Sequence, residues 1–556
     1  MDEKYIKLAN LIFPNITETI EDLEIKYPER GEGNVTRFAP SPTGFLHTGA
    51  LFTTLVDKLI AHDNNGSYML RVEDTDKKRE VLGSVKLFTE ELAQFGLSPD
   101  EGVISETEEI GKYGPYIQSK RSHIYDICAK YLVSKGLAYP CFCSKENIDS
   151  TRAMQEKTKV VPGYYGIYAK CRNLTVDDYI SKIEAGQEYI LRFRSSGNHL
   201  KKISFVDGAK GKIEMAQNDQ DIVIKKADGL PTYHFAHVCD DHFMRTTHVV
   251  RGEEWLPSTP IHIELFDAIG FKKPTYIHVP LIMVKDGDSR RKLSKRKDKE
   301  AAVIYFLKAG YPTEGVIEYL MTLVNSDFEM WRSANKDKDI SEFKFKLNKM
   351  SSSGSLLDMD KLNDISKNYI ATLNSEELFN KLINWSKTYN KDIYELLNKD
   401  EEYSKKVLSV ERDNAKKVRK DLAKYEDFLE YYSYFFENEY KKNLLNGFNF
   451  NFDNINITND LIKEILTKYL EVYNFNDTKE KWFSKIKEVA INFNFATDMK
   501  DYKLNKEKYS GSVAEIATII RVAVTSKTNT PDLYEIMNVI TSEKTINRIE
   551  NVINNI

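Results

Sequence analysis

Two short segments that lie far apart in the sequence carry the residue types that a phosphate-binding site needs. The first is Arg37-Phe-Ala-Pro-Ser-Pro-Thr-Gly-Phe-Leu-His47-Thr-Gly49, and the second is Lys292-Leu-Ser294-Lys295-Arg296. His47 can donate a hydrogen bond to phosphate oxygens, and Gly49, which has no Cβ, lets a nucleotide approach the backbone closely. The lysines of the second segment can neutralise a departing pyrophosphate. Together the two segments predict a site that binds and splits ATP.

The first segment lies between a predicted strand and a predicted helix. Residues 34–39 alternate in character, as a strand that enters a sheet does. Pro40 and Pro42 then end the strand, and after Gly49 the apolar residues recur at helical spacing. A helix that begins here would direct unpaired N–H groups and the positive end of its dipole at a phosphate.

The second segment lies in the densely basic stretch 286–299, which predicts a flexible loop after the strand-like residues 276–284. Such a run of charge is by itself typical of a solvated surface, or of a basic patch that binds RNA. Its pairing with the first segment favours phosphate chemistry instead. A mobile lysine above a preformed phosphate site is what the departure of pyrophosphate requires.

These segments resemble the signature pair of class I aminoacyl-tRNA synthetases, here in the forms His47-Thr-Gly49-Ala50 and Lys292-Leu-Ser294-Lys295. Five strings resemble bacterial-type glutamyl-tRNA synthetases and occur in the expected order: Arg37-Phe-Ala-Pro-Ser-Pro-Thr-Gly, Arg71-Val-Glu-Asp-Thr-Asp76, Gly114-Pro-Tyr-Ile-Gln-Ser-Lys, Asp228-Gly-Leu-Pro-Thr-Tyr-His and Arg251-Gly-Glu-Glu-Trp. The resemblance implies a ligase that uses ATP to activate L-glutamate and transfers it to the 3′ end of tRNA-Glu. Whether tRNA-Gln is also a substrate stays open.

The implied fold is an α/β one: a doubly wound parallel-sheet, Rossmann-type catalytic domain with an inserted α+β domain, followed by an all-α anticodon-binding region. The sequence pattern agrees, because strand and helix signals alternate up to about residue 290 and helical spacing dominates afterwards. The expected parts are an N-terminal extension (1–33), the first half of the catalytic domain (34–118), an inserted acceptor-end-binding domain (119–224), the second half of the catalytic domain (225–290), a stem-contact domain with the Lys292–Lys295 loop (291–390) and a helical anticodon-binding domain (391–556).

Glutamate carries two carboxylates and one ammonium, so a selective pocket needs at least two cations and one anion. By resemblance, Arg37 and Arg251 supply the cations, with a geometry that suits carboxylates. Glu73 supplies the anion, and Ser41 and Tyr233 add neutral hydrogen bonds. In glutaminyl relatives the position of Arg251 is not an arginine, so Arg251 is the expected specificity determinant for the side-chain carboxylate.

The resemblance places the remaining site residues around ATP: His47 and Gly49 at the phosphates, Glu254 and Trp255 at the adenosine, and Lys292, Ser294 and Lys295 at the departing pyrophosphate. No enzyme nucleophile is required, since catalysis is positioning and charge stabilisation. Mg²⁺ is expected on the phosphates, with no dedicated protein cage. His237 stands where the family often has asparagine, and its role stays open.

Cys141, Cys143 and Cys171 resemble a structural zinc site of some relatives, which is spaced Cys-x-Cys and then Cys-x-His. Structural zinc takes four ligands, and the fourth position here is Asn173, a poor ligand. The nearby Tyr164 offers no obvious replacement. Two interpretations stay open: bound zinc, or a relic that packing holds together.

Composition sets wider limits. The chain has 556 residues, 41% hydrophobic and 29% charged, which suits several globular domains. Its net charge of −4 neither requires nor excludes a nucleic-acid partner. The five cysteines argue against a disulfide framework, and the absence of a long apolar run or a leader predicts a cytoplasmic protein without a membrane partner. The resemblance implies a monomer.

Two alternatives remain beside the glutamate ligase. One is a glutaminyl-type synthetase, which Arg251 and the helical C-terminal half oppose. The other is a catalytically silent tRNA-binding paralogue, which the complete set of His47, Lys292 and Lys295 opposes, because a silent binder has no need of it.

Overall fold

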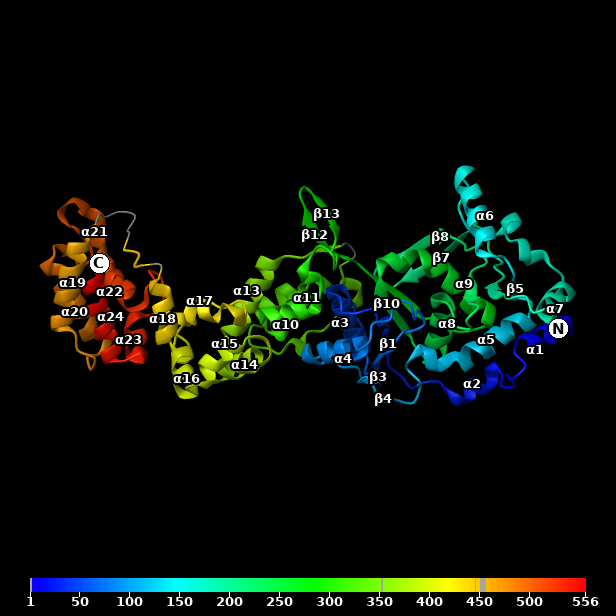
Figure 1. The fold of residues 1–556 in the computed structure, drawn as a ribbon, viewed down its shortest axis with the longest axis horizontal. Helices are drawn as coiled ribbons and strands as arrows, with labels where there is room; N and C mark the ends of the chain where they lie inside the picture. The colour runs from blue at the N-terminus through cyan, green and yellow to red at the C-terminus, as the bar shows by residue number, and fades with distance from the viewer. Residues whose placement is uncertain (1–2, 352–353, 446, 451–456) are drawn as a thin grey trace. The chain divides into compact units, whose positions relative to one another are not determined.

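The computed structural model describes residues 3–351, 354–445, 447–450 and 457–556 (Figure 1). The chain forms two compact units. One contains Met1–Tyr305 and Ile317–Asp358, and the other contains Phe306–Val316 and Met359–Ile556. Within the described ranges, no helix combines the length and the apolar character needed to cross a membrane.

The first unit mixes helices and short strands. Its helices are α1 (Glu3–Ile12), α2 (Ile20–Lys26), α3 (Thr48–Asp63), α4 (Ser84–Gln94), α5 (Ser122–Ser134), α6 (Lys145–Lys157), α7 (Val176–Glu184), α8 (Tyr233–Phe243), α9 (Thr259–Ile269) and α12 (Phe328–Ala334). Its strands are β1 (Val35–Phe38), β2 (Ser67–Leu70), β3 (Glu101–Val103), β4 (Glu109–Ile110), β5 (Ala138–Cys141), β6 (Ile190–Phe193), β7 (Lys202–Asp207), β8 (Gly211–Ala216), β9 (Val223–Lys225), β10 (His248–Gly252), β11 (Thr275–Val279), β12 (Ile282–Asp286), β13 (Ser289–Lys292) and β14 (Ser355–Leu356). Helices α10 (Val303–Ala309) and α11 (Thr313–Val324) have residues in both units.

Parallel strands form the centre of the first unit. Strands β1, β2 and β3 are parallel in that order, and β4 closes the edge in the antiparallel direction. Strands β10 and β11 form a second parallel pair. Thr247 joins the two groups, because its N–H donates to the Val35 carbonyl (2.9 Å) and its hydroxyl oxygen accepts from the Val35 N–H (2.7 Å). The predicted α/β class with a parallel sheet is confirmed.

The predicted strand, loop and helix around Gly49 are also present. All four residues of β1 are buried. Helix α3 begins at Thr48 and His47 is its N-cap, since His47 Nδ1 accepts the Gly49 N–H at 2.9 Å. The imidazole thus satisfies one of the N–H groups that a helix start leaves unpaired.

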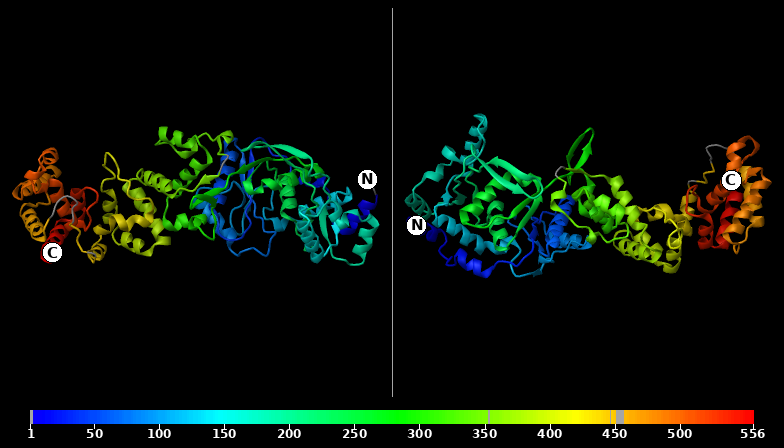
Figure 2. Two further views of the ribbon diagram at one scale, coloured as in Figure 1. Left: turned by 90° about the horizontal axis from the view of Figure 1, so that it is seen from above. Right: turned by 180° about the vertical axis from the view of Figure 1, so that it is seen from behind.

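The segment between α5 and α8 interrupts the parallel-strand pattern. Strands β5, β6 and β9 pair antiparallel, and β7 and β8 form a hairpin. The N-terminal helices α1 and α2 pack against α5, and both views of Figure 2 show this contact between the blue and cyan segments. A common apolar core contains Leu8, Leu132, Leu191 and Phe243, so the N-terminal extension and the inserted segment share a core with α8.

The prediction of a flexible loop over 286–299 is wrong for its first half. Residues Ser289–Lys292 form β13, which pairs antiparallel with β12 and aligns Lys292 with Met283. The turn between them contains Gly287 at φ +61°, a left-handed conformation that suits glycine. Charged, exposed side chains are common on edge strands, which is why a charge-dense strand resembles a loop in the sequence.

The second unit is helical, as predicted. Its helices are α13 (Met359–Ile370), α14 (Ser375–Tyr389), α15 (Lys391–Asn398), α16 (Glu401–Ser409), α17 (Phe428–Tyr432), α18 (Glu437–Leu444), α19 (Asn459–Val472), α20 (Lys479–Asn492), α21 (Met499–Leu504), α22 (Val513–Thr525), α23 (Leu533–Ile540) and α24 (Ser542–Asn555). In the described residues of this unit the strands are β15 (Phe495–Ala496) and β16 (Gly511–Ser512), which pair in parallel. Buried residues such as Leu382, Ile465 and Ile520 belong to one apolar core.

Candidate functional site

A cavity of about 1010 Å³ lies at the carboxyl ends of the parallel strands. Its lining residues follow β1 (Ala39, Ser41), follow β2 (Glu73), end β10 (Arg251, Gly252) and follow β11 (Pro280, Leu281). Ligands of open α/β sheets bind in this position, because the loops that leave the strands converge there. The fold therefore brings together side chains that come from distant parts of the sequence.

Ten of the twelve predicted ligand-binding residues line this cavity: Arg37, Ser41, His47, Gly49, Glu73, Tyr233, Arg251, Glu254, Trp255 and Lys292. Ser294 and Lys295 do not. The Lys295 ammonium donates to the Phe45 carbonyl, and the Ser294 N–H donates to Asp298 at 2.8 Å. Both belong to the loop that follows β13.

The neutral ring of His47 has one N–H group, and the backbone of Leu293 is a hydrogen-bond partner of this side chain. Its Nδ1 accepts the Gly49 N–H, so in the neutral ring the proton lies on Nε2. Burial lowers the pKa of His47, and the positive charges of Lys295 and Lys292 lower it further. The side chain is therefore a neutral donor at physiological pH, beside the N-terminus of α3.

Two arginines and two carboxylates form a buried ion network at the cavity, and two of the four, Arg37 and Glu73, line it. Arg37 Nε donates to Asp241 at 3.0 Å, and Arg71 Nη1 donates to the same carboxylate at 2.6 Å. Arg71 Nη2 donates to Glu73 at 3.0 Å. Burial alone would raise the pKa of Asp241, but the charges of Arg37 and Arg71 hold it well below its ordinary value.

Sequence reasoning gave no role to Arg71 or Asp241, although both hold predicted ligand-binding residues in place. One signal was present: Asp240 and Asp241 are adjacent carboxylates in α8, a helix whose residues from Phe235 to Phe243 are all buried. A buried carboxylate needs a charged or hydrogen-bonding partner. The pattern predicts buried ion pairs, but it does not name their partners.

Arg251 differs from Arg37 and Arg71 because its hydrogen-bond partners carry no charge. Its Nε donates to His278 Nε2 (3.0 Å), Nη1 contacts His262 Nδ1 (3.0 Å) and Nη2 donates to the Thr259 hydroxyl (2.8 Å). Burial lowers the pKa of both His278 and His262, so both rings are neutral at physiological pH. Arg251 is only 5% exposed and lines the cavity. None of the hydrogen-bond partners just named is a carboxylate.

The cavity is also lined by an aromatic pair and by an exposed ion pair. The rings of Tyr233 and Trp255 are 4.5 Å apart between centroids. Lys292 Nζ lies 2.9 Å from Glu254 Oε1, and both side chains are about half exposed. The predicted adenosine-side carboxylate and the predicted phosphate-side lysine are therefore partners in this structure.

Two protein-family models match most of the chain. A family model described as "tRNA synthetases class I (E and Q), catalytic domain" matches residues 34–364, and one described as "Anticodon binding domain" matches residues 376–553. The chain belongs to the class I (E and Q) tRNA synthetases.

Relatives of this synthetase match it over nearly their full length. A glutamate–tRNA ligase of Clostridium perfringens is 46% identical, and the match covers 98% of this chain and 100% of that protein. One from Acetivibrio thermocellus is 45% identical, with 99% and 100% of the two chains covered. The crystal structure of a glutamate tRNA ligase from Elizabethkingia meningosepticum, in complex with its amino acid, is 27% identical with a TM-score of 0.73, and covers 94% of this chain and 100% of that one.

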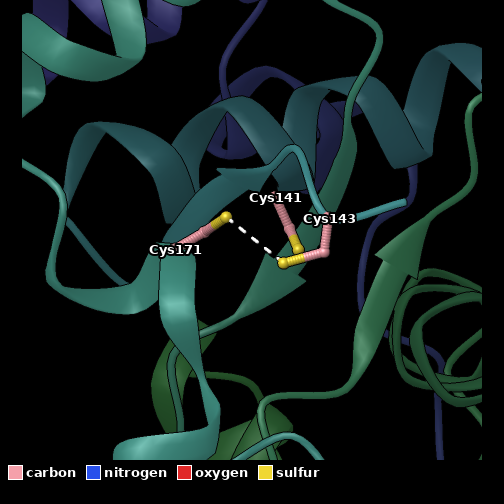
Figure 3. A group of neighbouring side chains, drawn as sticks. All are labelled: Cys141, Cys143 and Cys171. Atoms are coloured by element: carbon pink, nitrogen blue, oxygen red, sulfur yellow. Dashed lines mark hydrogen bonds between the residues drawn. The ribbon is translucent and has the colours of Figure 1, made fainter. Parts of the chain in front are cut away.

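The synthetase contains a second cluster of chemically reactive side chains, in the inserted segment. The sulfur atoms of Cys141, Cys143 and Cys171 lie within 4.8 Å of one another (Figure 3). In the part of the chain that the structure describes, these cysteines are the one group of three or more His, Cys, Asp or Glu side chains that could hold a metal ion. The Tyr164 hydroxyl lies 3.3 Å from both Cys141 Sγ and Cys143 Sγ.

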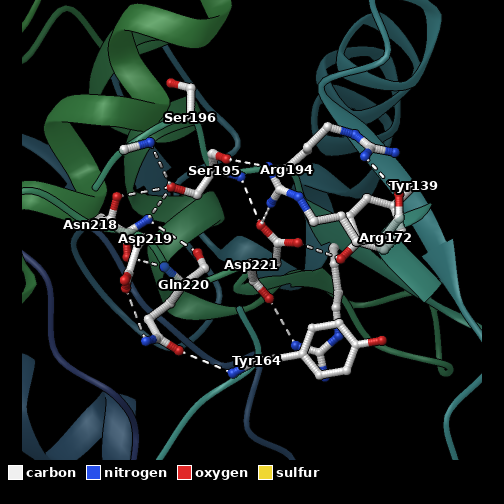
Figure 4. Close-up of polar contacts among 12 residues, drawn as sticks. Tyr139, Tyr164, Arg172, Arg194, Ser195, Ser196, Asn218, Asp219, Gln220 and Asp221 are labelled. Atoms are coloured by element: carbon white, nitrogen blue, oxygen red, sulfur yellow. Dashed lines mark hydrogen bonds and ion pairs between the residues drawn. The ribbon is translucent and has the colours of Figure 1, made fainter. Parts of the chain in front are cut away.

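Tyr164, which the sequence analysis considered and set aside, therefore places a fourth polar atom beside the three thiols. The Tyr164 N–H donates to Gln220 (3.0 Å), and its carbonyl accepts the Asp221 N–H (2.8 Å). Asp221 is fully buried and also accepts from Tyr139 (2.5 Å) and from Arg172 (Figure 4). This network holds the backbone of Tyr164 in place, and the Tyr164 hydroxyl itself accepts the Cys171 N–H at 3.0 Å.

The donor set fits zinc. Zinc bound tetrahedrally at about 2.3 Å from each sulfur keeps two sulfurs roughly 3.8 Å apart. Cys143 Sγ and Cys171 Sγ are 3.6 Å apart. Three thiols are ligands of the kind that structural zinc sites use, and the Tyr164 hydroxyl is a further polar atom 3.3 Å from two of them.

We expect replacement of Asp241 by asparagine to destabilise the first unit by about 3–5 kcal/mol, the usual cost of removing one partner from a buried ion network. The change leaves Arg37 and Arg71 buried beside a neutral amide. Differential scanning calorimetry of the full chain measures the loss. Asp177→Asn is the control, since its exposed pair with Lys4 contributes at most about 1 kcal/mol; equal losses in the two variants would contradict the role of Asp241.

Proposed function

We propose that this protein is a glutamate–tRNA ligase that activates L-glutamate with ATP and transfers it to the 3′ end of tRNA-Glu. Family membership supports the reaction class, since the relatives at 45–46% identity are named glutamate–tRNA ligases. ATP is a substrate of aminoacyl-tRNA synthetases. The choice of amino acid rests on the cavity itself.

The observation that carries the choice of glutamate is the charge state around Arg251. Arg37 pairs with Asp241, and Arg71 pairs with Asp241 and Glu73, but the hydrogen-bond partners of Arg251 are all uncharged. Burying an unpaired cation is costly, and a carboxylate ligand removes that cost. Glutamine has no side-chain charge with which to do so. Glu73 is the anion that is placed to receive the ammonium group.

The cavity supplies a route for adenylate formation. The glutamate α-carboxylate attacks the α-phosphorus of ATP, and pyrophosphate leaves; the terminal ribose hydroxyl of the tRNA then attacks the mixed anhydride. The N-terminus of α3 and the His47 N–H group bind phosphate oxygens, while Lys292 and Lys295 balance the charge of the departing pyrophosphate. Trp255 and Glu254 contact the adenosine. Mg²⁺ accompanies ATP and is held mainly by phosphate oxygens.

The tRNA contacts divide along the chain. We assign the acceptor end to the inserted segment 119–224, the stem to 291–390 and the anticodon to the helices of 391–556. Residues 34–118 and 225–290 then form the two halves of the catalytic domain. The anticodon model match at residues 376–553 supports the last assignment. Recognition of tRNA-Gln depends on anticodon contacts within that helical region.

Aminoacylation with labelled glutamate tests the proposal. Purified tRNA-Glu and tRNA-Gln are supplied separately, with unlabelled glutamine as the competitor. We expect charging of tRNA-Glu that excess glutamine does not suppress. Charging of both tRNAs would identify a non-discriminating ligase. Charging of neither, with tRNA still bound, would overturn the proposal in favour of a silent tRNA-binding protein.

Lys295→Ala should lower the rate of adenylate formation by at least about 100-fold, because one donor to the transition-state charge is lost. Its ammonium rests on the Phe45 carbonyl, so no buried ion pair is broken. Pre-steady-state formation of glutamyl-adenylate, with tRNA affinity measured in parallel, separates the two effects. Lys297→Ala, in the same loop, is the control. A loss of tRNA affinity as large as the loss of rate would refute the role given to Lys295.

We also propose that Cys141, Cys143, Cys171 and Tyr164 hold a structural zinc ion. Elemental analysis of the purified protein should give about one zinc per chain. Cys143→Ser should abolish this content and Tyr164→Phe should lower zinc retention against a chelator, because each removes one of four ligands. Tyr165→Phe is the matched control. Zinc well below stoichiometry after incubation with the metal would contradict the site.

A further inference from the structure

The environment of Arg251 restricts where the protons of its two histidine partners lie. A guanidinium has five N–H donors, no acceptor, and a charge that it does not lose. Each histidine nitrogen in contact with the guanidinium must therefore be a hydrogen-bond acceptor. His278 accepts through Nε2 and His262 accepts through Nδ1. Both rings must be neutral, and each must carry its proton on the other nitrogen.

Asp207 enforces this arrangement at His278. Its Oδ2 lies 2.6 Å from His278 Nδ1 and accepts the His278 backbone N–H at 3.2 Å, while its Oδ1 accepts the N–H groups of Ala209 (3.0 Å) and Lys210 (2.9 Å). Burial alone would raise the pKa of Asp207, but the hydrogen bonds from His278 and from this turn lower it. Asp207 is a fully engaged carboxylate with 1% exposure.

The backbone brings these three side chains into line. The register of β10 and β11 places Arg251 opposite His278. Asp207 is the last residue of β7, and the Gly208 N–H that follows donates to the Tyr276 carbonyl of β11 at 2.8 Å. A Cβ on Gly208 would lie 2.7 Å from Ile277, so only glycine permits this approach. The end of the β7–β8 hairpin is thus held against the strand that carries His278.

We propose that Asp207 and His278 are positioning residues for amino-acid selection: the carboxylate fixes the imidazole tautomer, and the imidazole fixes the guanidinium plane of Arg251 toward the substrate carboxylate. Asp207 belongs to the inserted segment, so that segment contributes to the amino-acid pocket as well as to its own surface. The inference rests on the proposed function, because it requires glutamate in the pocket.

Asp207→Asn is the decisive variant. The two N–H groups of the turn require an oxygen at the Oδ1 position, so the new amide presents its NH₂ group to His278. A donor there forces the imidazole proton onto Nε2, where it opposes Arg251 Nε–H. We expect the KM for glutamate to rise about 10- to 100-fold, the range of a lost hydrogen bond to a charged group. The KM values for ATP and tRNA should change by less than about threefold, and preference for glutamate over glutamine should fall.

Two further experiments distinguish the orientation of Arg251 from a general structural role of Asp207 and His278. His278→Gln supplies a neutral acceptor for Arg251 and should retain more glutamate affinity than His278→Leu, which supplies none. In an Arg251→Lys background the guanidinium Nε is gone, so Asp207→Asn should add little to the KM for glutamate. Asp219→Asn is the matched control, since Asp219 pairs with the exposed His199 in the same inserted segment.

The outcomes are distinct. An unchanged KM for glutamate in Asp207→Asn, or equal rises in all three KM values, would overturn the positioning role while leaving the ligase activity intact. Full additivity with Arg251→Lys would also overturn it, because the two residues would then act separately. A wild-type protein that does not charge glutamate at all would overturn the proposed function, and this inference with it.

Discussion

The shared ion network at Asp241 is the constraint on which the cavity depends. Its carboxylate is inaccessible to solvent and contacts Arg37, Arg71 and His237. Each buried ion costs several kcal/mol of desolvation, which only well-placed partners offset. Arg37 lies in β1, Arg71 directly follows β2, and Asp241 and His237 lie in α8, so the network is complete only when all three elements are correctly packed. Arg37 and Glu73 reach the cavity as part of it.

Charge is balanced differently at the two arginines that line the cavity. Arg37 is compensated by protein carboxylates, whereas Arg251 is surrounded by imidazoles, a hydroxyl and the ring of Tyr276, 4.6 Å from its guanidinium carbon. Neutral acceptors orient the guanidinium without neutralising it. The fold thus carries an uncompensated buried charge at one position, which lowers its own stability and reserves that charge for a ligand.

Local signals predicted much of this arrangement. The prolines and glycines after β1 and the helical spacing after Gly49 correctly predicted the loop and the helix that follow this strand, because turn and cap chemistry depends on neighbouring residues. The supporting residues could not be found in this way. Arg71 and Asp241 are 170 residues apart, and the contact of Asp207 with His278 depends on a strand register that no local pattern encodes. For the Cys141 cluster, the sequence named Tyr164 as a neighbour but could not show that its hydroxyl lies beside the thiols.

The exposed lysines Lys292 and Lys295 contrast with the buried arginines Arg37 and Arg251. Arg37 and Arg251 are 4% and 5% exposed and each has several partners. Lys292 has one ion-pair partner and a half-exposed side chain, and Lys295 rests on a backbone carbonyl outside the cavity lining. This difference in burial and contacts fits the chemistry of the proposed reaction. The substrate carboxylates keep their charges while they are selected, so fixed donors suit them. The charge on the phosphates moves to the leaving group during the reaction, so it is best met by side chains that are free to follow it.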